Sequence, residues 1–255
     1  MINFYAILSV VIVSFISFAG LFVLSINKNL LKKIIFVIVS LSVGALFGDT
    51  FIHLIPEACE SGLEAGILSI LILAGIIFFF LLEKFMLWRH SHAEHDQCKD
   101  CGTDENRIKS LGPMILMADG IHNFIDGVII GLSFLVSIEV GIATTLAIIF
   151  HEIPQEISDF CLLLHAGYSR AKALFLNFAS AATAILGTVL ALVIGAQLEN
   201  FIPYGLMIAA GGFIYIAGSD LVPELHKIKD MKKSLVQILA ILFGLGLMFA
   251  LLLFE

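Results

Sequence analysis

The sequence predicts an all-α integral membrane protein with eight transmembrane helices and both termini on the extracytoplasmic side. Of its 255 residues, 60% are hydrophobic, and the mean hydropathy of +1.05 is well above that of soluble domains. A helix needs about 20 apolar residues to cross a bilayer. Stretches of this kind cover 5–25, 34–55, 66–87, 112–137, 140–164, 171–195, 203–223 and 234–254.

The basic residues predict the orientation. When the helices are folded back and forth, all 14 Lys and Arg residues fall in alternate connections. Basic residues near the ends of a span stay in the cytoplasm, so an even number of spans places both termini outside. The connections are too short for a soluble domain, and we therefore expect 1–255 to form a single transmembrane domain in the cell membrane.

The spans differ in polarity. Each is expected to be helical, because backbone groups in lipid must be hydrogen-bonded within their own segment. The first, 5–25, is too long for the apolar region of a signal peptide and is interpreted as a retained helix. The spans 66–87, 171–195 and 234–254 are almost entirely apolar, and Asn177 is expected to bond a neighbouring helix. The other four carry ionisable side chains.

The fourth and fifth spans carry polar stripes. Along 112–137, the spacing i, i+3, i+4, i+7 sets the polar residues on one helix face; they are Asp119, His122, Asn123 and Asp126. Along 140–164, one-turn spacings do the same; the residues are His151, Glu152, Gln155, Glu156 and Asp159. These spans run antiparallel with a short connection between them, so their stripes can face each other.

The acidic side chains in these two spans need a cation. A charged side chain at the centre of a bilayer costs about 2.5–3.5 kcal/mol, and neither span contains Lys or Arg. Protons or a bound metal ion must neutralise the carboxylates. Histidine, carboxylate and amide oxygen together form a ligand set for a divalent transition metal. The sequence therefore predicts a metal site, and a proton relay without metal is the alternative.

Further ionisable residues lie in the second and seventh spans. Asp49, His53 and Glu57 follow one another at four-residue intervals, and Asp220 and Glu224 lie in SDLVPEL. With Asp119 and Asp159, we interpret these residues as groups along the entry and exit paths of an ion. Hydrogen bonding at helix ends is the alternative.

The connection 88–111 is polar and is expected to be a cytoplasmic His-rich loop. Clustered histidines and a C-x-x-C pair suggest weak, exchangeable metal capture. The residues concerned are His90, His92, His95, Cys98 and Cys101. A solvated loop without metal is the alternative.

The motifs HNFIDG (122–127) and HEIPQE (151–156) resemble the paired motifs of the ZIP (Zrt-, Irt-like) divalent-metal transporters. More closely, they resemble the branch whose fifth helix reads H-E-x-P-H-E-x-x-D. GDTFIHLIPEA in the second span is similar to that branch as well. One departure is Gln155, which stands where the branch has histidine. An amide oxygen is a harder and weaker ligand than imidazole, which favours broader metal acceptance.

The resemblance implies a function and a site. The implied substrate is zinc, or else iron, manganese or cadmium, moved toward the cytoplasm through a binuclear site. His122, Asp126, His151 and Gln155 would line the primary site, and Asn123, Asp126, Glu152 and Glu156 the second. The resemblance also implies a homodimer in the lipid bilayer. It implies no organic cofactor and no nucleic acid.

A membrane-embedded zinc metallohydrolase is the alternative function. HEIPQ resembles H-E-x-x-H, in which two histidines hold zinc and the glutamate activates water. Gln155 is a poor zinc ligand at the second position, and a stripe of acids suits ion passage better than hydrolysis. We therefore expect a transporter and not an enzyme.

Overall fold

The computed structural model shows an all-helical chain and describes residues 1–21, 27–97, 104–195, 197 and 199–254. The elements are, in order, α1 (Ile2–Phe15), η1 (Ile16–Ala19), α3 (Lys28–Gly48), η2 (Asp49–Leu54), α4 (Ile55–Glu60), α5 (Ala65–Gln97), α6 (Asp104–Val136), α7 (Ile138–His165), α8 (Arg170–Ala181), α9 (Thr183–Gly195), η3 (Glu199–Phe201), α10 (Ile202–Tyr215), η4 (Ile216–Leu221), α11 (Val222–His226), α12 (Met231–Leu251) and η5 (Leu252–Phe254).

The helices have the length and composition of an integral membrane protein. Within the described residues, seven segments are long and apolar enough to cross a membrane. They are Ile2–Ala19, Asn29–Glu60, Ala65–Lys84, Ile115–Val136, Arg170–Gly195, Ile202–His226 and Met231–Leu251. The predicted fifth span corresponds to α7, whose polar stripe leaves it outside this set. The number of eight spans therefore stays a prediction.

Two of the membrane helices contain a π-helical segment. η2 follows α3 and η4 follows α10, and each segment is succeeded by a short helix with proline in its first turn, Pro56 in α4 and Pro223 in α11. Proline supplies no N–H to the preceding turn, which favours a wider helical turn there. π-Helical turns occur frequently at functional sites, and η2 carries Asp49 and His53.

The helices pack in two groups at glycine crossings. In the first group, α1, α7 and α8 surround the pair α6–α9, where a Cβ on Gly127 would lie 1.9 Å from the carbonyl oxygen of Ala184. In the second group, α3 pairs with α12 and α5 with α10. A Cβ on Gly75 would lie 2.2 Å from the carbonyl oxygen of Ile208. Small residues let backbones approach closely where no hydrophobic force drives membrane helices together.

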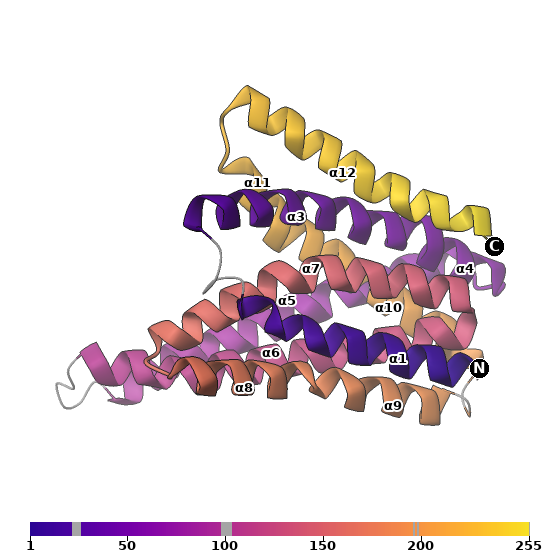
Figure 1. The fold of residues 1–255 in the computed structure, drawn as a ribbon. Helices are drawn as coiled ribbons and strands as arrows, with labels where there is room; N and C mark the ends of the chain where they lie inside the picture. Colours follow the sequence, from indigo (N-terminus) through magenta and orange to yellow (C-terminus); the bar gives the residue numbers. More distant parts are fainter. Residues whose placement is uncertain (22–26, 98–103, 196, 198, 255) are drawn as a thin grey trace.

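The two groups meet where α3 packs on α7. Ser42 Oγ donates a hydrogen bond to the carbonyl oxygen of Phe150, at 2.6 Å. Because α3 and α7 run in opposite directions (Figure 1), Asp49 lies beside Thr144 of α7, about 10 Å along the helix from this contact. Figure 1 also shows the start of α1 and the end of α12 at the same end of the bundle.

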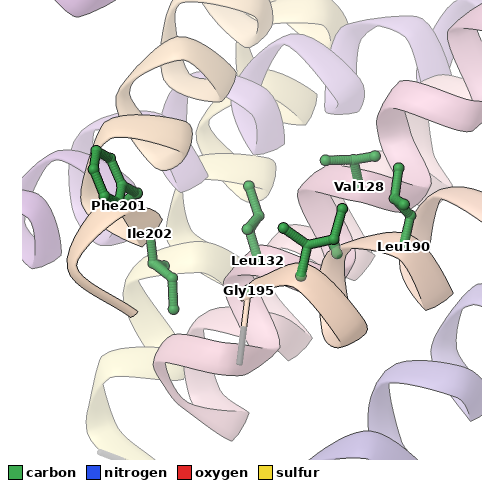
Figure 2. A pocket seen from close by; sticks show the side chains of 8 residues that line it. Val128, Leu132, Leu190, Gly195, Phe201 and Ile202 are labelled. Carbon is green, nitrogen blue, oxygen red and sulfur yellow. The ribbon is translucent and has the colours of Figure 1, made fainter. Parts of the chain in front are cut away.

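An apolar pocket lies between α6, α9 and the start of α10 (Figure 2). Its volume is about 190 Å³. Its walls are side chains such as Val128, Leu132, Leu190 and Phe201. A cavity lined by apolar side chains holds no ligand for an ion, so the functional site must lie elsewhere.

Candidate metal centre

Four side chains from α6 and α7 converge inside the first helix group. They are His122, Asp126, His151 and Glu152, and one ligand atom from each lies within 4.8 Å of all the others. Each helix contributes a neighbouring pair: one-turn spacing brings His122 and Asp126 together on α6, and adjacent positions on α7 supply His151 and Glu152. The polar stripes predicted for the two spans thus face each other.

The distances between these atoms match the spacing of zinc ligands. His151 Nε2 lies 3.1 Å from Asp126 Oδ2, 3.3 Å from His122 Nε2 and 3.6 Å from Glu152 Oε1. His122 Nε2 lies 3.4 Å from Glu152 Oε1 and 3.7 Å from Asp126 Oδ2. A zinc ion held tetrahedrally at about 2.0–2.1 Å separates its ligand atoms by about 3.3–3.4 Å. The four atoms therefore surround a space of the right size for such an ion.

The carboxylates of Asp126 and Glu152 are buried. Both oxygens of Asp126 and Oε1 of Glu152 are buried and have no hydrogen-bond partner within the described part of the chain. The sequence contains no Lys or Arg between Lys109 and Arg170. Buried carboxylates are normally paired or coordinated to metal, so the donor set fits a divalent cation.

The backbone orients one of the two imidazoles. His151 Nδ1 lies 3.2 Å from the carbonyl oxygen of Ala147, one turn earlier on α7. A proton on Nδ1 in this contact leaves Nε2 free as a ligand, the arrangement that metal-binding histidines usually have. The side chain of His122 is 16% exposed, whereas those of Asp126 and Glu152 are almost fully enclosed. The His122 side of the centre is therefore the open one.

Asn123 and Asp119 form a second polar group beside the centre. Asn123 Nδ2 donates to Asp119 Oδ1 at 2.8 Å, and Ser180 of α8 donates to Asp119 Oδ2. Both oxygens of Asp119 thus accept hydrogen bonds from the protein. Asn123 Oδ1 is buried and has no hydrogen-bond partner among the described residues, so this oxygen is available to a ligand.

Glu156 is bound on one side and free on the other. Asn177 Nδ2 donates to Glu156 Oε2 and to the carbonyl oxygen of Ser17, which joins α8 to α7 and η1. Glu156 Oε1 is buried and accepts no hydrogen bond from the residues that the structure describes. Asn177 thus makes the interhelical hydrogen bond expected of it.

Gln155 and Asp159 lie next to this second group. The half-buried side chain of Gln155 lies beside Asp119. Asp159 is half-buried one turn beyond Gln155, within electrostatic reach of Asp119 and Glu152. These residues continue the polar stripe toward the C-terminal end of α7.

The ionisable residues of the second predicted span form a separate buried pair. Asp49 Oδ1 lies 3.6 Å from His53 Nδ1, and both side chains are fully buried. Among the residues that the structure describes, none donates or accepts a hydrogen bond to the four polar atoms of Asp49 and His53, or to the hydroxyl of Thr144. Glu57, one turn later on α4, is half-buried and has an interaction partner.

The ionisable residues of the seventh span are exposed. Glu224 forms an ion pair with Lys227 on the surface, and the exposed Asp220 lies in η4. In the predicted cytoplasmic loop, Cys98 and Cys101 lie outside the described residues, as do the side chains of His90, His92 and His95. The metal capture predicted for that loop stays a prediction.

Ser180 contacts the site although the sequence did not indicate it. It lies in the predicted span 171–195, which is almost entirely apolar, and it donates a hydrogen bond to Asp119 across the helix interface. The signal was its position three residues after Asn177, because i and i+3 share a helix face. Ser180 and Asn177 together make α8 the third wall of the site.

A family model supports the interpretation of this geometry. The model described as "ZIP Zinc transporter" matches residues 2–107 and 88–252. The chain belongs to the ZIP zinc transporter family. It is 32% identical over 264 residues to "Zinc transporter ZIP13" of Danio rerio, across 86% of this chain and 75% of the relative.

Other ZIP proteins are similar to the chain over comparable lengths. "Zinc transporter ZIP13 homolog" of Drosophila melanogaster is 30% identical over 276 residues, across 85% of this chain and 77% of the relative. "Metal cation symporter ZIP14" of Xenopus tropicalis is 30% identical over 287 residues, across 88% of this chain and 62% of the relative. Family membership makes the chain a multi-pass membrane transporter of metal ions rather than an enzyme, so the hydrolase alternative is not favoured.

Proposed function

We propose that this ZIP protein moves a divalent transition-metal ion, zinc first, toward the cytoplasm through the cluster of His122, Asp126, His151 and Glu152. The observation that carries the proposal is the convergence of four ligand atoms on one space, on two helices that contain no Lys or Arg between Lys109 and Arg170. Iron, manganese and cadmium also suit a site of imidazole and carboxylate.

A second ion would occupy the position beside the first. Asn123 Oδ1 and Glu156 Oε1 are buried and unpaired, and Asp126 and Glu152 each have a further oxygen to share. Carboxylates that bridge two ions reduce the repulsion between the ions, which supports a binuclear site. Asp119 has both oxygens in hydrogen bonds with protein donors. We therefore assign it a role in positioning Asn123.

The route to this centre would pass the buried pair Asp49 and His53. Thr144 lies beside Asp49, and it precedes His151 by about 10 Å along α7. The carboxylate of Asp49 and the imidazole of His53 would give an entering ion an intermediate position on its way to the centre. Asp159, one turn beyond Gln155 on the opposite side, would serve the exit.

Topology and direction follow from the charges. If α7 also crosses the membrane, the chain has eight crossings. Both termini are then outside, and the connections rich in Lys and Arg are in the cytoplasm. Transport would proceed by alternating access, in which the first helix group (α1, α6, α7, α8 and α9) rocks against the second (α3, α5, α10 and α12). The centre lies within the first group and faces the second through the contact of α3 with α7.

The decisive experiment is metal flux into proteoliposomes that contain a zinc-sensitive dye. His122→Ala and Asp126→Ala should each abolish flux while the protein still inserts and stays monodisperse. The matched control is His226→Ala, because His226 is an exposed histidine on α11. Wild-type flux in either centre variant would refute the assignment of that residue. Binding of zinc without flux would refute transport and leave a metal sensor.

A further inference from the structure

A groove at one end of the bundle combines two lysines with apolar walls. Its volume is about 440 Å³. It is lined by Lys33, Phe36 and Val37 of α3, Ile228 of the connection before α12, and Lys233 and Val236 of α12. We call it the α3–α12 groove. It lies in the second helix group, apart from the metal centre.

The groove opens because α3 and α12 form a V. They touch where a Cβ on Gly44 would lie 2.1 Å from the carbonyl oxygen of Ile241, and one on Gly244 would lie 2.5 Å from that of Leu41. Figure 1 shows α12 diverging from α3 toward its N-terminal end. Lys33 and Lys233 each precede their glycine by 11 residues, so both lie about 16 Å from the vertex.

This distance sets the depth of the lysines. The vertex lies near the level of Ser42, which contacts Phe150 beside the metal centre. Half of the hydrocarbon core of a bilayer is about 15 Å. If the centre lies near the midplane, Lys33 and Lys233 reach the headgroup region of the cytoplasmic leaflet. Their aliphatic stems can lie along the apolar walls while the ammonium groups reach the headgroups.

Within the described part of the chain, neither lysine ammonium of the groove forms an ion pair. Glu224 pairs instead with Lys227, and Oδ1 of Asp230 caps α12 by accepting from the backbone N–H of Lys233. Two unpaired cations above an apolar cleft form a surface that is complementary to an anionic amphiphile.

We propose that the α3–α12 groove binds one anionic phospholipid of the inner leaflet. Its phosphate contacts Lys33 and Lys233, and an acyl chain fills the space between Phe36, Val37 and Val236. Basic pockets between membrane helices on the cytoplasmic side suit such headgroups. A free phosphate ion would contact only the lysines, whereas the acyl chain of a lipid would also cover the apolar walls of the groove.

Native mass spectrometry of the full chain in detergent tests the proposal. Phosphatidylglycerol should bind, and phosphatidylcholine with the same acyl chains should not. The double variant Lys33→Gln/Lys233→Gln should bind phosphatidylglycerol about thirtyfold more weakly, because each lysine near an anionic surface raises affinity roughly five- to sixfold. Lys33→Arg/Lys233→Arg should retain binding. The matched control is Lys229→Gln/Lys232→Gln, which removes the same charge from outside the groove.

A second pair of variants tests the apolar part. Val236→Trp should fill the groove and weaken binding, whereas Leu235→Trp, at an exposed position outside the lining, should not. Equal binding of the two lipids overturns the proposal. It is also overturned if the control lysine pair loses as much affinity as the groove pair, or if inorganic phosphate displaces the lipid at matched concentration. Zinc flux enters none of these outcomes, so they are independent of the proposed transport function.

Discussion

Replacing Gly127 with alanine should push α6, the helix that carries His122 and Asp126, away from α9. An added Cβ would lie 1.9 Å from the carbonyl oxygen of Ala184, and ordinary contact begins at 3.4 Å. The backbones of α6 and α9 would have to move apart by the difference, about 1.5 Å. The hydrogen bond from Thr188 Oγ1 to the Gly127 carbonyl, at 2.8 Å, opposes that movement. Overpacking of this kind typically costs about 1–3 kcal/mol.

The same substitution should reduce flux, because Gly127 directly follows Asp126. Asp126 Oδ2 lies 3.1 Å from His151 Nε2, and metal–ligand distances tolerate shifts of only about 0.2 Å. A displacement of α6 by several times that amount misplaces the carboxylate. Disturbing groups that orient metal ligands typically costs about 10–100-fold in affinity or activity, and we expect flux to fall by a factor in that range.

Two measurements on one preparation test this reasoning. Thermal unfolding in detergent reports the packing cost, and zinc flux into proteoliposomes reports the effect on the centre. Gly246→Ala in α12 is the matched control, because a Cβ there has no atom within 4 Å. At that position alanine should be neutral or stabilising by up to about 1 kcal/mol. If Gly127→Ala unfolds and transports like the wild type, the close crossing does not support the centre.

Three further predictions concern selectivity, protons and topology. Gln155→His should shift the ratio of zinc to manganese flux in competition toward zinc, because imidazole is a better zinc ligand than an amide; an unchanged ratio would remove Gln155 from the ion's surroundings. The zinc concentration for half-maximal flux should rise as pH falls from 7.5 to 5.5, by roughly tenfold per pH unit for each proton displaced, since protons compete for the same ligands; a flat profile would contradict that competition. A variant retaining only Cys59, which is exposed at the end of α4, should react with a membrane-impermeant maleimide from outside intact cells; labelling only after permeabilisation would reverse the topology.

Hydropathy was sufficient to predict the helices because lipid leaves the backbone few alternatives. Apolar stretches of about 20 residues must be helical to satisfy their own N–H and C=O groups, and the structure is all-helical, as predicted. The 3.6-residue period likewise placed each polar stripe on one face of its helix. Hydropathy does not say which helix faces pack against each other. The short connection between 112–137 and 140–164 strongly limits how these two helices can pack.

Features that depend on contacts between distant helices could not be predicted in this way. The break between α8 and α9 lies inside the predicted span 171–195, where Thr183 Oγ1 donates to the carbonyl oxygen of Gly120 on α6. The π-helical segments η2 and η4 likewise lie within apolar runs whose hydropathy does not change. Hydropathy averages over a window, whereas these features depend on single hydrogen bonds and prolines.

The hydrogen-bond partners of the acids predict which of them bind an ion and which stabilise the fold. Asp119 accepts from Asn123 and Ser180, so its charge is already stabilised by the protein. Asp126 has no hydrogen-bond donor on either oxygen among the described residues, and a buried carboxylate in that state costs several kcal/mol unless a cation arrives. Asp119→Asn should therefore leave the centre able to bind zinc more weakly, through misplacement of Asn123, whereas Asp126→Asn should remove binding. Zinc titration of the two purified variants distinguishes these roles, and equal losses would show that satisfied and unsatisfied acids act alike.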